Sequence, residues 1–368
     1  MTTRWLEVRR TGPRGTRRRW LAAVALLVGS VGLVAGSTLL GTVAIPPQLV
    51  FQILLHQVSN GGLYPAPCAG VTVSQPLCGA YVVIIWQLYV PEILLALIVG
   101  AALGISGGAL QGIFRNPLAD PFLLGISSGG TIGAAVIYVY RFQEANADLF
   151  LPLFAFIGSV GTGLLILGIA RGRFSSVETL LLTGVALANL LSAILSLILL
   201  YNPAGSDQVT FWLLGGLGLA TWQVDGIACG AVLILATALA LHGRELNLIQ
   251  LGHDVAQSAG VDARRVRVRV ILLASLTTAV AVAFTGIIGF VGLVSPHIVR
   301  RVWGTDYRVV LPGAAAVGAV FLLAARDVNY LLFPGSLLPL GIFTAFAGVP
   351  FFLYLLYRQR TASTMGAP

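Results

Sequence analysis

Long apolar segments separated by short polar stretches run along the whole chain. A transmembrane helix needs about 20 consecutive, mostly apolar residues. The segments that meet or approach this length are 20–41, 91–114, 121–140, 150–170, 178–201, 224–241, 270–287, 288–299, 309–325 and 339–357. The pattern therefore predicts an all-α membrane protein of about ten transmembrane helices. The boundary near 286–290 is the least distinct, because Gly286 and Gly289 interrupt one long apolar run.

Four stretches between these segments have a different pattern. Residues 45–58 open on two prolines and place apolar residues at helical spacing, which predicts an amphipathic helix at the membrane surface. Residues 59–79 are rich in Gly and Pro and predict a loop. Residues 202–223 are Gly-rich and predict an interfacial return, while 242–269 form a long polar connection.

Composition supports the membrane class. The chain is 57% hydrophobic and 10% charged, whereas a soluble domain carries about 25% charged residues. All 22 basic residues are Arg and give a net charge of +9. They lie in the connections between apolar segments, which is typical of membrane orientation and not of a nucleic-acid partner. With the N-terminus inside, every Arg except Arg141 and Arg326 falls on one side, so both termini are predicted to be cytoplasmic.

The residue types exclude several kinds of chemistry. The chain contains no Lys, and a Walker A loop requires a Lys on the nucleotide phosphates. If ATP drives this protein, a separate subunit must bind it. His56, His242, His253 and His297 are scattered, and no Cys/His set has metal-ligand spacing. We expect no catalytic residue, no metal site and no cofactor.

Three cysteines are present. Cys68 and Cys78 lie in the predicted loop on the outer side, where oxidation is feasible. They either form a disulfide, which would contribute about 2–4 kcal/mol, or remain two free thiols. Cys229 lies within an apolar segment and is interpreted as a packing residue.

Two strings are distinctive. Residues 100–130 read GAALGISGGALQGIFRNPLADPFLLGISSGG, and residues 284–301 read FTGIIGFVGLVSPHIVRR. Together with DYRVVLP at 306–312 and GIFTAFAGVPFF at 341–352, they resemble the FecCD-type permease family of ABC importers for iron-siderophores, haem and vitamin B12. The resemblance runs in collinear order over 86–358.

The resemblance implies a type II ABC importer permease in the bacterial cytoplasmic (inner) membrane. It divides the chain into a basic cytoplasmic segment (1–19), a transmembrane permease domain (20–358) and a cytoplasmic tail (359–368). The implied partners are two ATP-binding cassette ATPase subunits, an extracytoplasmic substrate-binding protein, a second permease copy or a paralogue, and the lipid bilayer. The implied cargo is a bulky metal chelate: a ferric siderophore, haem or cobalamin, with an iron chelate favoured because that class is the commonest.

A polar helix bounded by two glycines lies within 242–269. By resemblance it is the coupling helix that seats in a groove of the ATPase subunit. Its residues are Gly252, His253, Asp254, Val255, Ala256, Gln257, Ser258, Ala259 and Gly260. His253 stands where an acidic residue is usual. The alternative interpretation is a solvated loop with arginines that anchor the neighbouring span.

A cytoplasmic gate can be assigned in the same way. In a B12-importing relative the constriction comes from the Asn-Pro-Leu turn and from a small polar pair before the fifth span. The matching residues here are Asn116, Leu118, Ser175 and Ser176. Ordinary turn and helix-capping chemistry is an alternative role for the same residues.

The outer face departs from the family pattern. Relatives carry Arg-x-Pro-Arg before the second span and an Arg after the ninth, and these arginines receive acidic residues of the binding protein. The corresponding residues here are Tyr89, Glu92 and Tyr330, and Leu337 replaces a usual Glu. Arg326 lies nearby but out of register. Either the binding protein carries complementary changes, or a paralogous permease supplies the arginines.

Two other classes of protein fit the sequence less well. A secondary transporter driven by an ion gradient needs carboxylates deep in the membrane, whereas Asp120, Glu178 and Asp225 lie near the ends of their spans. A membrane-embedded enzyme needs a catalytic constellation, and the sequence has no HExxH string or paired carboxylates.

Overall fold

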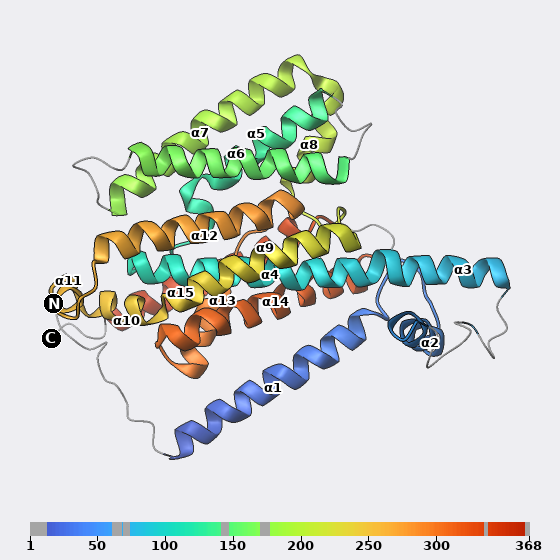
Figure 1. Cartoon of the computed structure of the whole chain (residues 1–368), viewed down its shortest axis with the longest axis horizontal. Coiled ribbons are helices and arrows are strands. Elements are labelled where there is room, and N and C mark those ends of the chain that lie inside the picture. Colours follow the sequence, from blue (N-terminus) through green and yellow to red (C-terminus); the bar gives the residue numbers. More distant parts are fainter. Residues whose placement is uncertain are drawn as a thin grey trace.

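The computed structural model describes residues 13–60, 68, 74–140, 147–169, 177–334 and 338–364. These ranges fold into helices joined by short connections and contain no β-strand. Most of the long helices run roughly along one common direction, as Figure 1 shows. The all-α class predicted from the apolar segments is confirmed.

Fifteen α-helices and three shorter helical turns follow one another along the described chain. Their bounds are α1 Pro13–Ser37, α2 Pro47–Val58, α3 Gln75–Val83, η1 Ile84–Tyr89, α4 Val90–Phe114, η2 Pro121–Leu124, α5 Ile126–Val139, α6 Ala147–Ile169, α7 Val177–Tyr201, η4 Pro203–Gly205, α8 Ser206–Leu213, α9 Trp222–Leu241, α10 Gly243–Leu251, α11 His253–Ser258, α12 Ala263–Thr285, α13 Val291–Trp303, α14 Tyr307–Leu332 and α15 Leu340–Thr364.

Seven helical stretches in the described part of the chain are long and apolar enough to cross a membrane. They lie in α1, in α3 to α4, and in α6, α7, α9, α12 and α14. Two shorter apolar helices, Ile126–Val139 and Leu340–Tyr354, coincide with two further predicted spans. The predicted span at 288–299 corresponds to α13, which has 13 residues. A multi-pass membrane protein is therefore the class that the structure supports.

The predicted loop over 59–79 is too long by several residues. Helix α3 begins at Gln75, with Pro76 in its first turn, and continues through η1 into α4 as one stretch of 40 residues. Proline is well suited to the first turn of a helix, because its missing N–H has no partner there in any case. The predicted return over 202–223 also contains a short helix, α8.

A sharp break separates α12 from α13 where the apolar run was ambiguous. Gly286 has a φ of +68° and Phe290 a φ of +67°. A Cβ at Gly286 would overlap the carbonyl oxygen of Trp212, so only glycine fits there. The ring of Phe290 lies directly against Gly348 of α15. Phe290 therefore has a left-handed backbone at the point where its ring packs against α15.

Helix α4 is the centre of the bundle. It contacts α14 most extensively and also packs on α12, α13 and α9. Nearly every residue of α4 from Val99 to Phe114 is buried. A second group, α5 to α8, lies on the far side of α12 from α4 (Figure 1). Helices α1 and α7 are the least covered, with 6% of each apolar window buried in the chain.

Glycines allow α4 to approach its neighbours at backbone distance. A Cβ at Gly100 would overlap the carbonyl oxygen of Gly318 on α14, and one at Gly104 would overlap that of Ala314. Gly107 lies in the same way against Gly292 on α13. Small residues at such contacts let the helix backbones approach closely and gain van der Waals contact. Such contact matters in a membrane because lipid tails are as apolar as the side chains, so the hydrophobic effect does not drive the helices together.

We predict that Gly104→Val lowers the free energy of unfolding of the bundle by about 3 kcal/mol, the upper end of the usual cost of overpacking. The obstructing atoms are backbone and cannot rotate away. Gly161→Val on α6 is the matched control, because nothing lies within 4 Å of a Cβ there. Recovery of monodisperse protein after heating in detergent would measure both variants. Equal recovery for the two would contradict the assigned contact.

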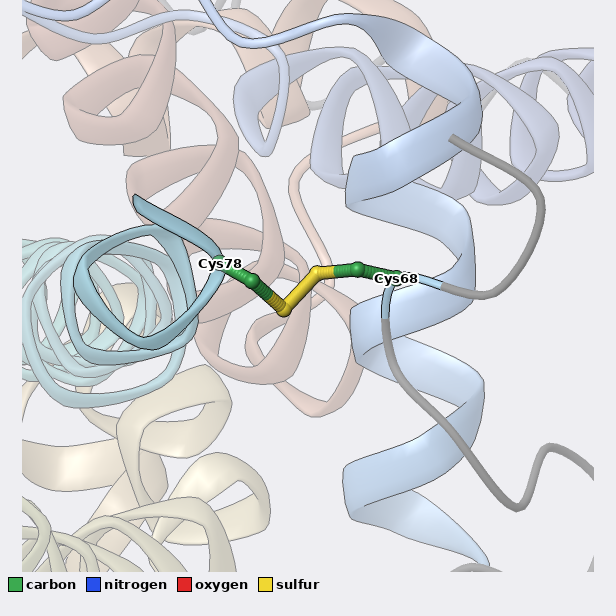
Figure 2. The surroundings of a disulfide bond; sticks show 2 residues. All are labelled: Cys68 and Cys78. Atoms are coloured by element: carbon green, nitrogen blue, oxygen red, sulfur yellow. A yellow bond between two sulfur atoms is a disulfide. The ribbon is translucent and has the colours of Figure 1, made fainter. Parts of the chain in front are cut away.

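Cys68 and Cys78 are joined by a disulfide with 6.2 Å between their Cα atoms, shown in Figure 2. The bond ties the first turn of α3 to the segment that follows α2. Cys68 also packs against a small apolar cluster of Ile45, Leu49, Val50, Ile53 and Ile85. The disulfide therefore anchors α3 beside α2 at one end of the bundle.

Replacing both cysteines by Ser should lower stability by about 2–3 kcal/mol, the loop-closure value for a ring this short. Alkylation of the denatured, unreduced protein should label Cys229 alone, and reduction should expose two further thiols. Cys229→Ser is the control for loss of a thiol that forms no bond. Three alkylated cysteines without reductant would show that the bond does not form.

Candidate functional site

Polar side chains gather at the two ends of the bundle. One end, called the α11 end below, carries α10, α11 and the turn after α4. The other, called the disulfide end, carries α2, α3 and the C-terminal part of α14. Figure 1 shows the two ends at opposite extremes of the long axis.

The polar helix predicted between two glycines is present as α11, His253–Ser258. Gly252 has a φ of +127° and Gly260 a φ of +78°, which are conformations that favour glycine. Ala256 is buried, whereas Val255 is 46% exposed. The Ala256 side chain thus packs this short helix against the core, and most of the helix surface is exposed.

Asp262 follows α11 and caps α12. Its carboxylate accepts hydrogen bonds from the backbone N–H groups of Arg264 and Arg265, each at 3.1 Å, and pairs with the Arg265 side chain at 2.9 Å. These hydrogen bonds and nearby positive charges hold the pKa of Asp262 below its ordinary value. The cap fixes where α12 starts and so limits the length of the α11 connection.

The turn after α4 holds two of the four predicted gate residues. Arg115 adopts a left-handed conformation and ends the helix. The side chain of Asn116 then accepts a hydrogen bond from the Leu118 backbone N–H at 2.9 Å. Asn116 is exposed and Leu118 is half-buried. Ser175 and Ser176 lie outside the described residues.

Asp120 completes this turn by capping η2. Its carboxylate accepts from the Phe122 backbone N–H at 2.9 Å. Burial raises the pKa of Asp120 to about 6, and the hydrogen bond offsets only part of that effect.

A buried charge network lies at the disulfide end. We call it the Arg326 network, and its members are Ser37, Glu92, Arg326, Asp327 and Tyr330. The Arg326 guanidinium donates to Glu92 and to Asp327, each at 2.9 Å, and to the Ser37 carbonyl oxygen at 3.2 Å. Its side chain is 1% exposed, against 17% for Glu92 and 5% for Asp327.

Further contacts close the network. The Tyr330 hydroxyl donates to Glu92 at 2.9 Å, and the Ser37 hydroxyl donates to Asp327. Arg326 also lies over the Tyr330 ring, 4.5 Å from its centroid. The network therefore joins α1, α4 and α14, and each charged group in it has a partner of opposite sign.

The three residues predicted for binding-protein docking come together here. Tyr89 packs edge-on against Tyr330, and its hydroxyl accepts a hydrogen bond from the Val43 backbone N–H at 3.0 Å. Tyr89 and Tyr330 are both buried. The basic group that faces Glu92 is Arg326 of the same chain. Leu337 lies outside the described residues.

Sequence reasoning did not find the pairing of Glu92 with Arg326. The residues are 234 positions apart, and no local spacing connects them. One signal was available: charged residues near the ends of apolar spans are costly unless they pair with one another. Glu92, Arg326 and Asp327 satisfy that description together.

Arg326→Met should lower the free energy of unfolding by about 3–5 kcal/mol, because it leaves the buried Asp327 and the half-buried Glu92 without a positive charge beside them. Arg265→Met is the control; it removes an ion pair whose Arg is 77% exposed, and such surface pairs contribute about 0–1 kcal/mol. Denaturation of the purified protein in detergent micelles would measure both. A stability for Arg326→Met equal to that of the unchanged chain would mean that the network does not hold this end together.

The fold and its two polar ends define a multi-pass membrane protein of the permease class. A model of the FecCD transport family matches residues 15–358, so the chain belongs to that family. The match starts before the region of 86–358 that the motifs indicated, and it includes α1 to α3.

Named relatives are permease subunits. The chain is 39% identical over 283 residues to the hemin transport system permease protein of Yersinia pestis, covering 75% of this chain and 84% of that protein. It is 36% identical over 363 residues to the cobalamin import system permease protein of Halobacterium salinarum, covering 92% of this chain and 95% of that protein. A solved metal-chelate type ABC transporter in an inward-facing conformation has a TM-score of 0.70 at 31% identity, covering 84% of this chain and 98% of that one.

Proposed function

We propose that the chain is the transmembrane permease subunit of an ABC importer. It forms the path for a bulky metal chelate, such as a ferric siderophore, haem or cobalamin, in a bacterial cytoplasmic membrane. The observation that carries the proposal is α11: a short helix bounded by two glycines and held outward at the Arg-rich end of a FecCD bundle. Residues Gly252 to Gly260 are proposed to seat in a groove of the ATPase subunit.

The proposed topology has ten crossings with both termini in the cytoplasm. The crossings are α1, α3 to α4, α5, α6, α7, α9, α12, α13, α14 and α15. The α11 end is then cytoplasmic, in keeping with the arginine distribution. Because the chain has no Lys and hence no Walker A loop, ATP must be bound by two separate ATPase subunits. A second copy or a paralogue completes the path.

Both predicted functional surfaces remain part of the proposal. Asn116, Leu118, Ser175 and Ser176 are proposed to narrow the cytoplasmic side of the path. Tyr89, Glu92 and Tyr330 are proposed to shape the outer face on which the binding protein docks. Because Arg326 and Tyr330 both bond to Glu92, this face would be recognised by shape and not by a free carboxylate.

A secondary transporter is disfavoured by where the carboxylates lie. Among the described residues, Asp225 occupies the first turn of α9 and Asp327 lies near the end of α14. Glu92 bonds the same Arg326 as Asp327 and so lies at the same level as Asp327. Ion-coupled transport requires ionisable groups deep in the membrane.

The proposal is tested by reconstitution. The chain, with its cognate ATPase and binding protein, is placed in liposomes and offered hemin, cyanocobalamin or radioactive ferric citrate. We expect uptake of one chelate that requires ATP and stops when the Walker A Lys of the ATPase is replaced. Uptake that follows a proton or sodium gradient without ATP would refute the proposal.

A further inference from the structure

Helix α10 connects α11 to the rest of the molecule. On one side it leads directly into α11 through Gly252, whose backbone N–H donates to the Ile249 carbonyl oxygen at 3.3 Å. On the other side its apolar residues Leu246 and Ile249 are buried in the main core cluster. The position of α11 therefore depends on how α10 is attached, together with the burial of Ala256 in the same core cluster.

A single amide attaches α10 to the start of α14. The Asn247 side chain donates from Nδ2 to Asp306 Oδ1 at 2.6 Å and accepts at Oδ1 from the Tyr307 backbone N–H at 2.9 Å. The same Asp306 oxygen caps α14 by accepting from the Arg308 N–H at 2.9 Å. The Asn247 side chain thus donates one hydrogen bond to the N-terminal end of α14 and accepts another from it. An amide can do both because it carries an NH₂ donor and a carbonyl acceptor side by side.

Two further bonds attach α10 to the last turn of α4. Gln250 donates from Nε2 to the Gly112 carbonyl oxygen at 2.6 Å, and Arg115 donates to the Ile249 carbonyl oxygen. Position 112 has no room for a side chain, because a Cβ there would lie 2.7 Å from the Tyr307 ring. Helix α10, the end of α4 and the start of α14 therefore form one tightly bonded unit.

The attachment extends through α4 to α13. Gln111, next to Gly112, is 2% exposed. It donates to the Gly292 carbonyl oxygen at 3.1 Å and accepts from the Arg300 side chain. Within α11, by contrast, the Ser258 hydroxyl bonds to the Asp254 carbonyl oxygen of its own helix at 2.8 Å.

We infer that Asn247 and Gln250 are positioning residues that transmit displacement of α11 to α14 and α4. The inference rests on the proposed function and deepens it: the ATPase subunits would pull on α11, and the amides on α10 would move α4 and α14 with it. The two helices run the length of the bundle, so the displacement reaches the disulfide end.

An exchange of residues isolates the Asn247 contact. Asn247→Asp places two carboxylates together and breaks the bond to Asp306. In the double variant Asn247→Asp/Asp306→Asn the bond between the two side chains re-forms with donor and acceptor exchanged when the amide at position 306 turns its nitrogen toward position 247 and its oxygen toward the Arg308 N–H, because a single Asp306 oxygen serves both partners in the unchanged chain. We expect uptake per ATP hydrolysed to fall roughly 2- to 30-fold in the single variant, the range of coupling changes along such contacts, and to recover in the double variant.

Hydrogen exchange of the complete complex with ATP and vanadate separates coupling from mere stability. In the unchanged complex, nucleotide should alter exchange both in α11 and in peptides covering 111–118 and 306–312. In Asn247→Asp the change should persist in α11 and disappear from the peptide covering 306–312. Gln250→Met should reduce the change at 111–118, where the Arg115 bond to Ile249 remains, and leave the change at 306–312 intact, which provides a second variant if the first does not fold.

Two outcomes would overturn the inference: normal uptake per ATP in Asn247→Asp, or an unchanged exchange response at 306–312 in that variant. Failure of the proposed function is seen separately. It would be the absence of ATP-dependent uptake, or of any nucleotide effect on α11, in the unchanged complex.

Discussion

The backbone contact between α4 and α14 is the interaction on which the rest of the structure depends. Gly100, Gly104 and Gly318 bring the two helices together along the middle of the bundle. Each of the two helices then contributes groups to both ends. Helix α4 carries Glu92 at one end and Gly112 at the other, and α14 carries Arg326 and the capping residue Asp306. A change of spacing between these helices would displace both polar ends at once.

The two ends use different chemistry, and the difference has a physical consequence. At the disulfide end, α1, α4 and α14 are joined by buried charges, and removing one charge of such a set is strongly unfavourable. At the α11 end, amides and arginine side chains bond to backbone groups, to one another and to one carboxylate; a neutral bond contributes about 0.5–1.5 kcal/mol and a bond to a charged group about 1.5–3 kcal/mol. The first arrangement resists separation. The second can be exchanged for other contacts one bond at a time, at a lower cost for each.

Much of the fold could be predicted from the sequence, because apolar segment length is set directly by the membrane. The short helix between Gly252 and Gly260 was also predictable, since two glycines with positive φ bound it. Helix α3 was missed because Gly, Pro and Cys dominate its surroundings, although Pro76 in a first turn is a helix-start signal. The left-handed backbone of Phe290 could not be predicted, since its contact is with Gly348, far along the chain.

The Arg326 network shows the same limit at the candidate site and also explains a departure of the sequence. Tyr89, Glu92 and Tyr330 stand at positions where the family pattern indicates other residues, and taken one at a time they look like three unrelated losses. In the structure, Glu92 is bonded by Arg326 and by Tyr330, and Tyr89 packs on Tyr330. A half-buried carboxylate at position 92 is stabilised by a cation and a donor nearby, and Arg326 and Tyr330 supply them. The three departures are therefore parts of one arrangement, in which the chain itself supplies the cation and the donor that Glu92 bonds.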